Sequence, residues 1–295
     1  MAMDQADKLR EKVELLKEQA PSSRVIAVTS GKGGVGKTSL SVNLALQMQA
    51  QGKKVVILDA DFGLANVEIM LGIRPQYNLA DLIFNNKSIE EIITEGPMGV
   101  GFISGGSGVQ DLVNLDKEKL KSLIAKLVKL DSLYDVIIID TGAGIADSVI
   151  EFVLSSPEVL LVVTPEPTSI TDAYSLLKAV NRKKEFNREQ KSIKVVTNRV
   201  NNVEEGQEIY DKISIVVSKF LNIQLEYLGY IPFDKGLTNA VVEQKPISMQ
   251  APNSDASLRI KGICGKLLDE AYEDTEKVGI AKVLLNFIKS KKNNR

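Results

Sequence analysis

The stretch Gly31-Lys32-Gly33-Gly34-Val35-Gly36-Lys37-Thr38 decides the fold of this chain. It satisfies the phosphate-loop pattern, in which glycines let backbone N–H groups turn toward the phosphates of a nucleotide. In such a loop the lysine, here Lys37, reaches the β- and γ-phosphate oxygens, and the next hydroxyl, here Thr38, joins the magnesium shell. A second lysine, Lys32, is not required by the pattern. The stretch therefore predicts a site for a nucleotide and Mg²⁺, with one additional cation.

The residues on both sides of the loop support this prediction, because a phosphate loop joins a strand to a helix. Arg24 to Ser30 predict a buried strand, and Ser39 to Gln51 show helical spacing of apolar residues before Gly52. The helix N-terminus would add its dipole to the anion site. A glycine-rich surface loop without a ligand is the alternative, and it leaves this context unexplained.

The rest of the chain alternates short apolar runs with amphipathic segments. The expected strands after the first are 54–58, 100–104, 136–139, 159–163, 193–197 and 225–230, and the expected helices are 117–130, 147–154, 168–184 and 204–221. Such alternation is typical of a mostly parallel twisted sheet with helices on both faces. The sequence therefore predicts an α/β fold with one domain at 22–272 and two appendages, at 1–20 and 278–295.

Composition limits the chemistry available to the protein. The chain has 295 residues, of which 44% are apolar, with no histidine and a single cysteine, Cys264. Serine–histidine catalysis, histidine-bound zinc, internal disulfides and cysteine-built metal sites are therefore excluded within one chain. A net charge of −1 indicates no general attraction to nucleic acid. Neither a signal-like N-terminus nor an apolar run of about eighteen residues is present, so we expect a cytoplasmic protein.

Three aspartates follow apolar runs and can reach the phosphate site. Asp59 and Asp61 come at the carboxyl end of the strand at 54–58, and Asp140 opens the segment Asp140-Thr141-Gly142-Ala143-Gly144. We expect Asp140 at the tip of its strand, where it holds magnesium partly through water, with Asp59 also near the metal. Because there is no histidine, one of Asp59 and Asp61 is the best candidate to position the attacking water, and we favour Asp61 for this role. A simple strand-ending turn is the alternative for Asp140.

The second lysine and the aspartate segments together resemble a known family. The loop with Lys32, the segment Asp59-Ala60-Asp61-Phe62-Gly63-Leu64-Ala65-Asn66 and the segment from Asp140 to Gly144 are similar to the MinD/ParA group of deviant Walker A ATPases. The resemblance implies an ATPase that dimerises around ATP, with Lys32 touching the partner's phosphates. A cation from a neighbour can neutralise charge on the transferred phosphoryl group, as arginine fingers do. The alternative is a solvated loop lysine.

The resemblance also implies where the rest of the nucleotide binds. Asn198 would hydrogen-bond the base, the turn from Pro232 to Asp234 would line the adenine pocket, and Glu166 would lie near the ribose. Without the family, these segments would be interpreted as ordinary loops. The complete set of expected ATP-binding residues is Gly31, Lys32, Gly33, Gly34, Val35, Gly36, Lys37, Thr38, Ser39, Glu166, Asn198, Arg199, Pro232, Phe233 and Asp234.

The C-terminal segment predicts an amphipathic helix. Its apolar face would consist of Ile280, Val283, Leu284, Phe287 and Ile288, with Lys282 and Lys289 opposite. This layout is typical of an interfacial helix, which we expect to bind anionic inner-membrane lipid weakly as one copy and more strongly as two in an ATP-bound dimer. A terminal helix packed permanently on its own domain is the alternative. Docking in the monomer and release in the dimer would reconcile the two.

The N-terminal segment carries a second family feature. Asp4, Gln5, Ala6, Leu9 and Arg10 match the Asp-Gln-Ala-x-x-Leu-Arg element of the FlhG family of flagellar number regulators, also called YlxH or FleN. In that family the element binds and stimulates the GTPase FlhF. MinD lacks such an extension, so the two ends of the chain favour FlhG. The resemblance implies a Mg-ATPase at the inner membrane that sets flagellar number or placement, with FlhF as a partner and flagellar C-ring proteins as further candidates.

Other functions stay open on the sequence. A ParA-like DNA-partition ATPase shares the nucleotide site, although the near-zero net charge and the apolar tail argue against it. A MinD-like division-site regulator is a second alternative, and a nucleotide-sensing scaffold with negligible turnover is a third. A redox or iron–sulfur carrier role like that of nitrogenase reductase fails, because Cys264 alone cannot provide two ligands per subunit.

Overall fold

The sheet of this protein is built around the strand that precedes the phosphate loop. A computed structural model describes residues 23–61, 66–106, 117–187, 191–269 and 278–293, and within them eight strands form one sheet in the order β3-β4-β2-β5-β1-β6-β7-β8. The strands are β1 Arg24–Ser30, β2 Val55–Ala60, β3 Thr94–Glu95, β4 Gly101–Ser104, β5 Val136–Ala143, β6 Glu158–Val163, β7 Ser192–Val200 and β8 Glu226–Pro232. All neighbours are parallel except β3 and β4.

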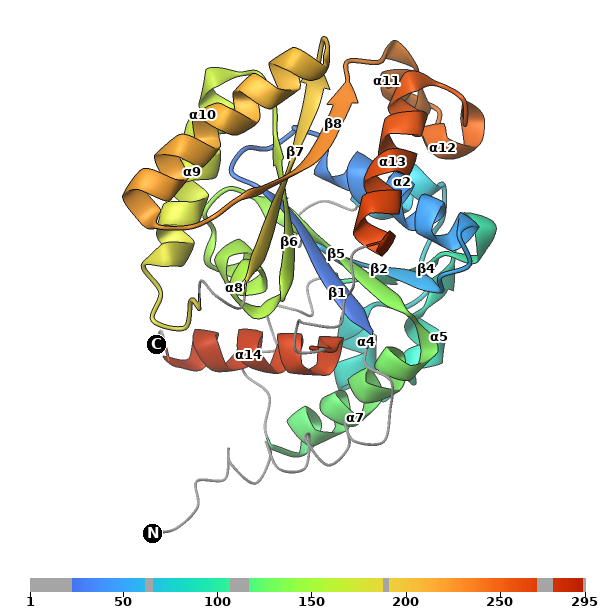
Figure 1. Cartoon of the computed structure of the whole chain (residues 1–295). Coiled ribbons are helices and arrows are strands. Elements are labelled where there is room, and N and C mark those ends of the chain that lie inside the picture. The colour runs from blue at the N-terminus through green and yellow to red at the C-terminus, as the bar shows by residue number, and fades with distance from the viewer. Residues whose placement is uncertain (1–22, 62–65, 107–116, 188–190, 270–277, 294–295) are drawn as a thin grey trace.

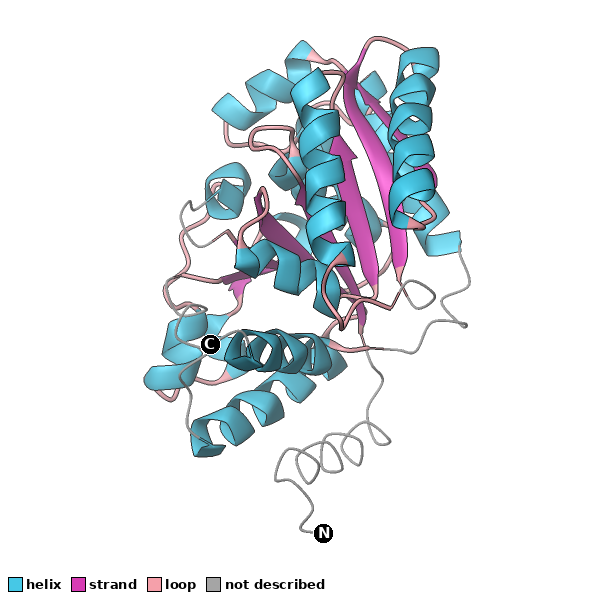
Figure 2. Ribbon diagram, turned by 90° about the vertical axis from the view of Figure 1, so that its left-hand side faces the viewer, coloured by secondary structure: helices cyan, strands magenta, loops and turns pink. Residues whose placement is uncertain are grey.

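Helices cover both faces of the sheet (Figures 1 and 2). They are α2 Lys37–Ala50, α3 Asn66–Leu71, α4 Leu79–Phe84, α5 Ile89–Ile92, the 3₁₀ turn η1 Pro97–Gly99, α7 Lys117–Leu133, α8 Asp147–Ser155, α9 Pro167–Asn181, α10 Val203–Leu221, α11 Lys235–Val242, α12 Ile247–Gln250, α13 Asp255–Asp269 and α14 Ile280–Asn293. Helices α2 and α13 pack on one face, and α7, α8, α9, α10 and α14 pack on the other. The predicted α/β fold is confirmed.

Side chains of each central strand alternate between the two cores. On β1, Ile26 and Val28 pack toward α2 and α13, whereas Val25 and Ala27 pack on the face that α7 and α14 cover. Because successive side chains of a strand point to opposite faces, a strand covered on both sides must be apolar throughout. This requirement explains why the strands could be recognised as continuous apolar runs.

The structure corrects the expected position of two aspartates. Strand β5 continues to Ala143, so Asp140 lies inside the strand and the expectation that it sits at the strand tip was wrong. The strand is longer because Thr141 pairs with Ala60 and Ala143 pairs with Ser30. Asp59 also lies inside its strand, β2, directly beside Asp140 in the parallel register.

Several short helices were not predicted from the sequence. They are α3, α4, α5, α11, α12 and the longer α13, and they cover the sheet edges and the space beside α2. Asn78 and Ser88 cap α4 and α5 through capping boxes, each with an acidic residue three positions later. These caps are local signals that the sequence carries at Asn78 and Ser88.

The apolar face of α14 is buried within the same chain. Ile280, Val283, Leu284, Phe287 and Ile288 are all at most 2% exposed. The helix packs against α7 and α8 across the lower end of the molecule in Figure 1. The ring of Phe287 lies 4.5 Å from that of Phe152 of α8, measured between centroids. In this arrangement the face expected to meet lipid is covered by protein. None of the described helices combines the length and apolar content needed to cross a bilayer.

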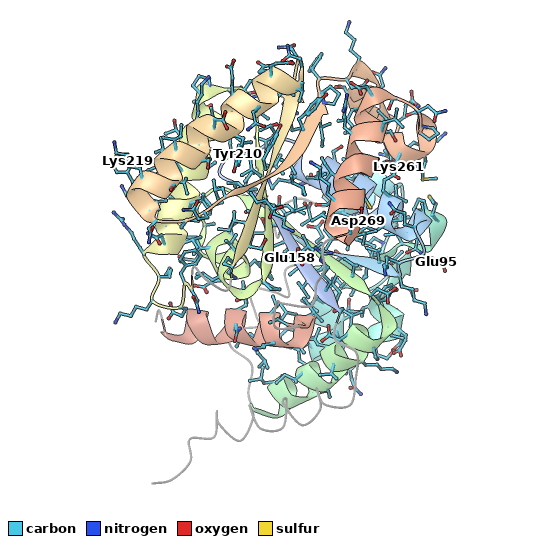
Figure 3. The ribbon with its side chains drawn as sticks, in the orientation of Figure 1. Glu95, Glu158, Tyr210, Lys219, Lys261 and Asp269 are labelled. Atoms are coloured by element: carbon cyan, nitrogen blue, oxygen red, sulfur yellow. The ribbon has the colours of Figure 1, made fainter. Side chains whose placement is uncertain are left out.

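A buried ion pair fixes the amino-terminal ends of the central strands. Glu158, labelled in Figure 3, begins β6 and accepts two hydrogen bonds of 2.6 Å from the Arg24 guanidinium of β1. Lys194 of β7 lies 3.6 Å from the same carboxylate. The Arg24 side chain also donates to the carbonyl of Leu267, which ties α13 to the sheet. The opposite, carboxyl ends of these strands carry the polar side chains described next.

Candidate functional site

A cavity of about 880 Å³ lies beyond the carboxyl ends of the parallel strands. Among the expected ATP-binding residues it brings together Gly33, Gly34, Gly36, Lys37, Thr38, Ser39, Asn198, Arg199, Pro232, Phe233 and Asp234. Asp61 also lines it. Gly31, Lys32, Val35 and Glu166 are outside the described lining, as are Asp59 and Asp140, which are buried beneath it. The loop after β1 and the turns after β7 and β8 thus surround one space.

The phosphate loop has a backbone that requires glycine. Gly34 and Gly36 have φ values of +73° and +98°, in the left-handed region. A Cβ at Gly36 would collide with the Asn198 amide, and a Cβ at Gly31 would collide with the backbone of Asp172 in α9. The loop is therefore held closely between β7 and α9. Ser39 lines the cavity, and its buried hydroxyl has no hydrogen-bond partner among the residues that the structure describes.

Asn198 contacts the phosphate loop directly, which the sequence did not indicate. Its side chain is 2% exposed, and its amide nitrogen donates to the Val35 carbonyl at 2.7 Å. Its carbonyl oxygen accepts from the Arg199 N–H at 2.9 Å. One amide hydrogen and one lone pair remain for a ligand. Asn198 thus braces the loop, in addition to the expected role toward the base.

Asp140 holds the start of α2 through both carboxylate oxygens. Thr38 donates its hydroxyl to one oxygen at 2.7 Å, and Ser41 donates to the other at 2.8 Å. Asp140 is fully buried, and this burial raises its pKa to about 6. Burial likewise raises the pKa of the neighbouring Asp59 to about 7, with Asp140 adding like-charge repulsion. Burial lowers the pKa of Lys37, which the charges of Asp140 and Asp61 oppose.

These groups fit a magnesium ion that is shared with nucleotide phosphates. Within the described part of the chain, no three or more His, Cys, Asp or Glu side chains form a metal-binding group. Mg²⁺ does not need such a group, because it usually takes one or two carboxylates together with phosphate oxygens and water. The Thr38 hydroxyl and the Asp140 carboxylate already lie together. The unpartnered Ser39 hydroxyl leaves a donor for a phosphate oxygen.

Asp61 lies at the wall of the cavity, one residue beyond β2. Its carboxylate accepts a hydrogen bond of 3.3 Å from the Asn66 amide, and Asn66 lines the same cavity. Gly142 faces this carboxylate, because a Cβ there would lie 3.6 Å from an Asp61 oxygen. Asn66 lies in the segment that resembles the family, but no role could be assigned to it from the sequence. The structure makes it the neighbour that orients Asp61.

Lys32 is directed away from the cavity of its own chain. Its ammonium donates to the Glu166 carboxylate at 2.6 Å and to the Thr168 hydroxyl at 2.8 Å, both at the start of α9. The side chains of Lys32 and Glu166 remain 35% and 48% exposed. The hydrogen bond from Lys32 lowers the pKa of the Glu166 carboxyl. Lys32 and Glu166 thus form an exposed ion pair beside the cavity.

An apolar rim of the cavity was missed by the sequence interpretation. It consists of Ile69, Met70, Leu237, Val241 and Val242, with Thr238 beside them. Leu237 and Val241 are spaced as neighbours on one helix face, and Asp234 caps α11 by accepting the Gly236 N–H at 2.7 Å. Val242 is 79% exposed and Phe233 is 60% exposed. The predicted N-terminal partner residues, Asp4 to Arg10, lie outside the described residues, as does the side chain of Lys289.

Comparisons with known proteins show the family of the chain. A family model of the ParA type, described as NUBPL iron-transfer P-loop NTPase, matches residues 22–268. The chain is 43% identical over 244 residues to the antiactivator FleN of Pseudomonas aeruginosa. The alignment covers 83% of this chain and 86% of FleN. It is 34% identical over 251 residues to the flagellum site-determining protein YlxH of Helicobacter pylori. This alignment covers 84% of this chain and 83% of YlxH.

A solved structure shares the fold. A chain of the MinC:MinD cell division protein complex of Aquifex aeolicus superposes with a TM-score of 0.65 at 27% identity, over 86% of this chain and 99% of that chain. The resemblance that rested on Lys32 and the aspartate segments is thereby confirmed over most of the sequence. The chain belongs to the MinD/ParA family of P-loop ATPases, within the FleN and YlxH group, also called FlhG, and it is an ATPase.

Proposed function

We propose that this ATPase dimerises around Mg-ATP, attaches reversibly to the inner membrane through α14, and regulates the number or placement of flagella. The flagellar part is supported by the similarity to an antiactivator and to a flagellum site-determining protein. The nucleotide part is supported by the cavity that the phosphate loop, Asp61 and the β7 and β8 turns enclose. The dimer part is supported by the position of Lys32, and the membrane part is supported by α14.

The residues of the cavity divide the work of ATP hydrolysis. Lys37 and the loop N–H groups bind the phosphates, while Thr38 and Asp140 hold Mg²⁺, which supplies positive charge for the phosphoryl group that is transferred. Asp59 lies beside Asp140 and supports the same metal site. Asp61 accepts a hydrogen bond from the attacking water and orients it toward the γ-phosphate. Asn198 and the turn from Pro232 to Asp234 receive the base.

The observation that carries the dimer is the position of Lys32. It belongs to the phosphate loop yet does not line its own cavity, and it lies on the exposed rim, paired with Glu166. Exposed ion pairs of this kind contribute only about 0.2–1 kcal/mol, so the pair can be exchanged readily. A second chain that presents its γ-phosphate at this rim would attract Lys32 more strongly. Glu166, once released, would be available to bind the ribose, as the family resemblance implies.

The buried face of α14 makes membrane attachment conditional. Undocking exposes five apolar side chains, each worth at most about 1.5–3 kcal/mol when buried, so a free helix in water is disfavoured. Insertion at an anionic lipid surface buries the same face again and adds attraction for lysines. Two helices on one dimer bind with avidity. We therefore propose docking in the monomer and release to the membrane in the dimer.

The proposed partners follow from the two ends of the chain and from the relatives. The N-terminal element with Asp4 to Arg10 would bind and stimulate an FlhF-type GTPase, and flagellar C-ring proteins are further candidates. The ATP-bound form would be peripheral at the cytoplasmic face of the inner membrane, and the released form cytoplasmic. No nucleic acid is expected, since the net charge is −1.

The decisive experiment compares the mass of the chain in solution with ADP and with a non-hydrolysable ATP analogue. We expect a single chain with ADP and a dimer with the analogue, and only the dimer should sediment with anionic vesicles. A variant that lacks residues 278–295 should dimerise without sedimenting. A chain that stays monomeric when saturated with the analogue contradicts the proposal. DNA binding that survives the same deletion would favour the ParA-like alternative.

A further inference from the structure

Asp131, in the last turn of α7, links the two ends of the described chain. Its carboxylate accepts a hydrogen bond from the Ser23 hydroxyl at 2.5 Å. The same carboxylate accepts the backbone N–H groups of Ile280 at 2.8 Å and of Ala281 at 3.4 Å. Ser23 is the first residue that the structure describes, and Ile280 begins α14. One buried side chain therefore contacts both the first described residue and the start of α14.

The carboxylate occupies the place of a helix cap for α14. The first N–H groups of a helix have no partner within the helix, and a nearby acidic side chain satisfies them and complements the helix dipole. Residue 279 is a glycine, which has no side chain to do this. A Cβ at Gly279 would collide with Asp131, so the glycine is what allows the approach. Asp131 is only 8% exposed.

Ser23 lies in an equally confined position. It is 1% exposed, and the N–H of the next residue, Arg24, donates to the Asp135 carbonyl at 2.9 Å, which fixes the chain beside the end of α7. A buried carboxylate is stabilised by each donor that it retains, and the loss of one makes its burial more costly. Ser23 and the Ile280 N–H donate to the same carboxylate oxygen, Oδ1, so Ser23 holds that oxygen in the position that caps α14. If Ser23 moves away, the carboxylate loses a contact that orients it toward the first turn of the helix.

We propose that Asp131 is a latch through which a displacement of Ser23 loosens α14. Any change that draws Ser23 out of its position would thereby favour undocking of the helix. The consequence for membrane attachment rests on the proposed function. The latch itself is a property of the folded chain and can be tested without lipid or nucleotide.

The test is hydrogen exchange of the full chain, followed at the backbone amides of residues 280–288. Asp131→Asn keeps the shape and one acceptor but removes the charge, and we expect about fivefold to tenfold faster exchange in α14. Ser23→Ala should give a smaller increase. The double variant should exchange no faster than Asp131→Asn, because Ser23 acts through Asp131. The control is Asp135→Asn, which removes a carboxylate that accepts the Lys54 N–H and should leave α14 unchanged.

Two outcomes would overturn the latch. Unchanged exchange of α14 in Asp131→Asn would show that the apolar face alone holds the helix. Additive effects of Ser23→Ala and Asp131→Asn would show that Ser23 does not act through Asp131.

Sedimentation with phosphatidylglycerol vesicles separates the latch from the proposed function. If exchange accelerates as expected but Asp131→Asn binds vesicles no better than the wild type without nucleotide, the latch stands and the membrane role of α14 fails. If the wild type binds vesicles with the ATP analogue but exchange in Asp131→Asn is unchanged, the membrane role stands and the latch fails.

Discussion

The Lys32 ammonium and the Glu166 carboxylate of the same chain lie 2.6 Å apart, on the rim of the nucleotide cavity rather than inside it. Thr168 adds a second acceptor at 2.8 Å. In the proposed dimer, Lys32, the additional lysine of the phosphate loop, would face the second copy. The pair also keeps a positive charge out of the cavity while the chain is alone.

Lys32→Ala should abolish the ATP-dependent dimer while leaving the affinity of one chain for ATP within about threefold of the wild type. The reason is that Lys32 does not line its own cavity, whereas Lys37 does. Light scattering with a non-hydrolysable analogue measures the dimer, and calorimetry measures the affinity. Lys212→Ala, which removes an exposed lysine paired with Glu208 on α10, is the matched control. Dimers of normal stability in Lys32→Ala would refute a role across the interface.

Asp61→Ala should slow phosphate release by about 10²-fold or more, because it removes the group that orients the water. ATP binding and the dimer should persist, so this variant should accumulate on vesicles. Asn66→Ala, which removes only the hydrogen bond to Asp61, should cause a smaller loss. Phosphate release is measured with and without lipid. An unchanged rate in Asp61→Ala would reassign the water-positioning role.

Asn198→Ala should weaken the binding of ATP and of inorganic tripolyphosphate alike, by roughly tenfold, because the Val35 carbonyl loses its buried donor and the phosphate loop loses its brace. Phe233→Ala is the contrast, since Phe233 lines the cavity at the expected base site. It should weaken ATP but leave tripolyphosphate binding unchanged. Calorimetric titration of both ligands checks this. Normal tripolyphosphate binding in Asn198→Ala would show that Asn198 contributes only to binding of the base.

Lys191 should make the free energy of unfolding depend on pH. Its ammonium donates to the Leu154 carbonyl at 2.7 Å and to that of Ser156, and burial lowers its pKa to about 8. A lysine with a lowered pKa binds fewer protons in the folded state than in the unfolded state. Its contribution to the free energy of unfolding therefore rises as the pH increases from about 8 toward the unfolded value.

The wild type should accordingly gain on the order of 2 kcal/mol relative to Lys191→Met between pH 7 and pH 10.5. Urea unfolding at several pH values measures the difference. Lys212→Met, on an exposed lysine, should show no such trend against the wild type. A difference between wild type and Lys191→Met that does not change with pH would contradict the assignment.

Local patterns in the sequence were enough to predict the phosphate loop and every described strand of the sheet except the two-residue edge strand β3. The central strands are buried on both faces and must be apolar along their whole length, so each produces a visible run. The short helices α3, α11 and α12 have few residues and no long period, and they exist because the domain supplies neighbours to pack on. Asp234 is a local N-cap signal for α11, but only the tertiary structure places this helix at the rim of the cavity.

The sequence by itself determined which groups are available: a phosphate loop with two lysines, three aspartates after apolar runs, no histidine, and a C-terminal segment with one apolar face. Only the tertiary structure decided which of these groups contact one another. Asp59 lies beside Asp140, Asn198 braces Val35 from 163 positions away, and Asp131 caps α14. The physical reason is that an apolar face has the same spacing whether protein or lipid covers it, and hydrogen bonds between distant segments leave no period in the sequence.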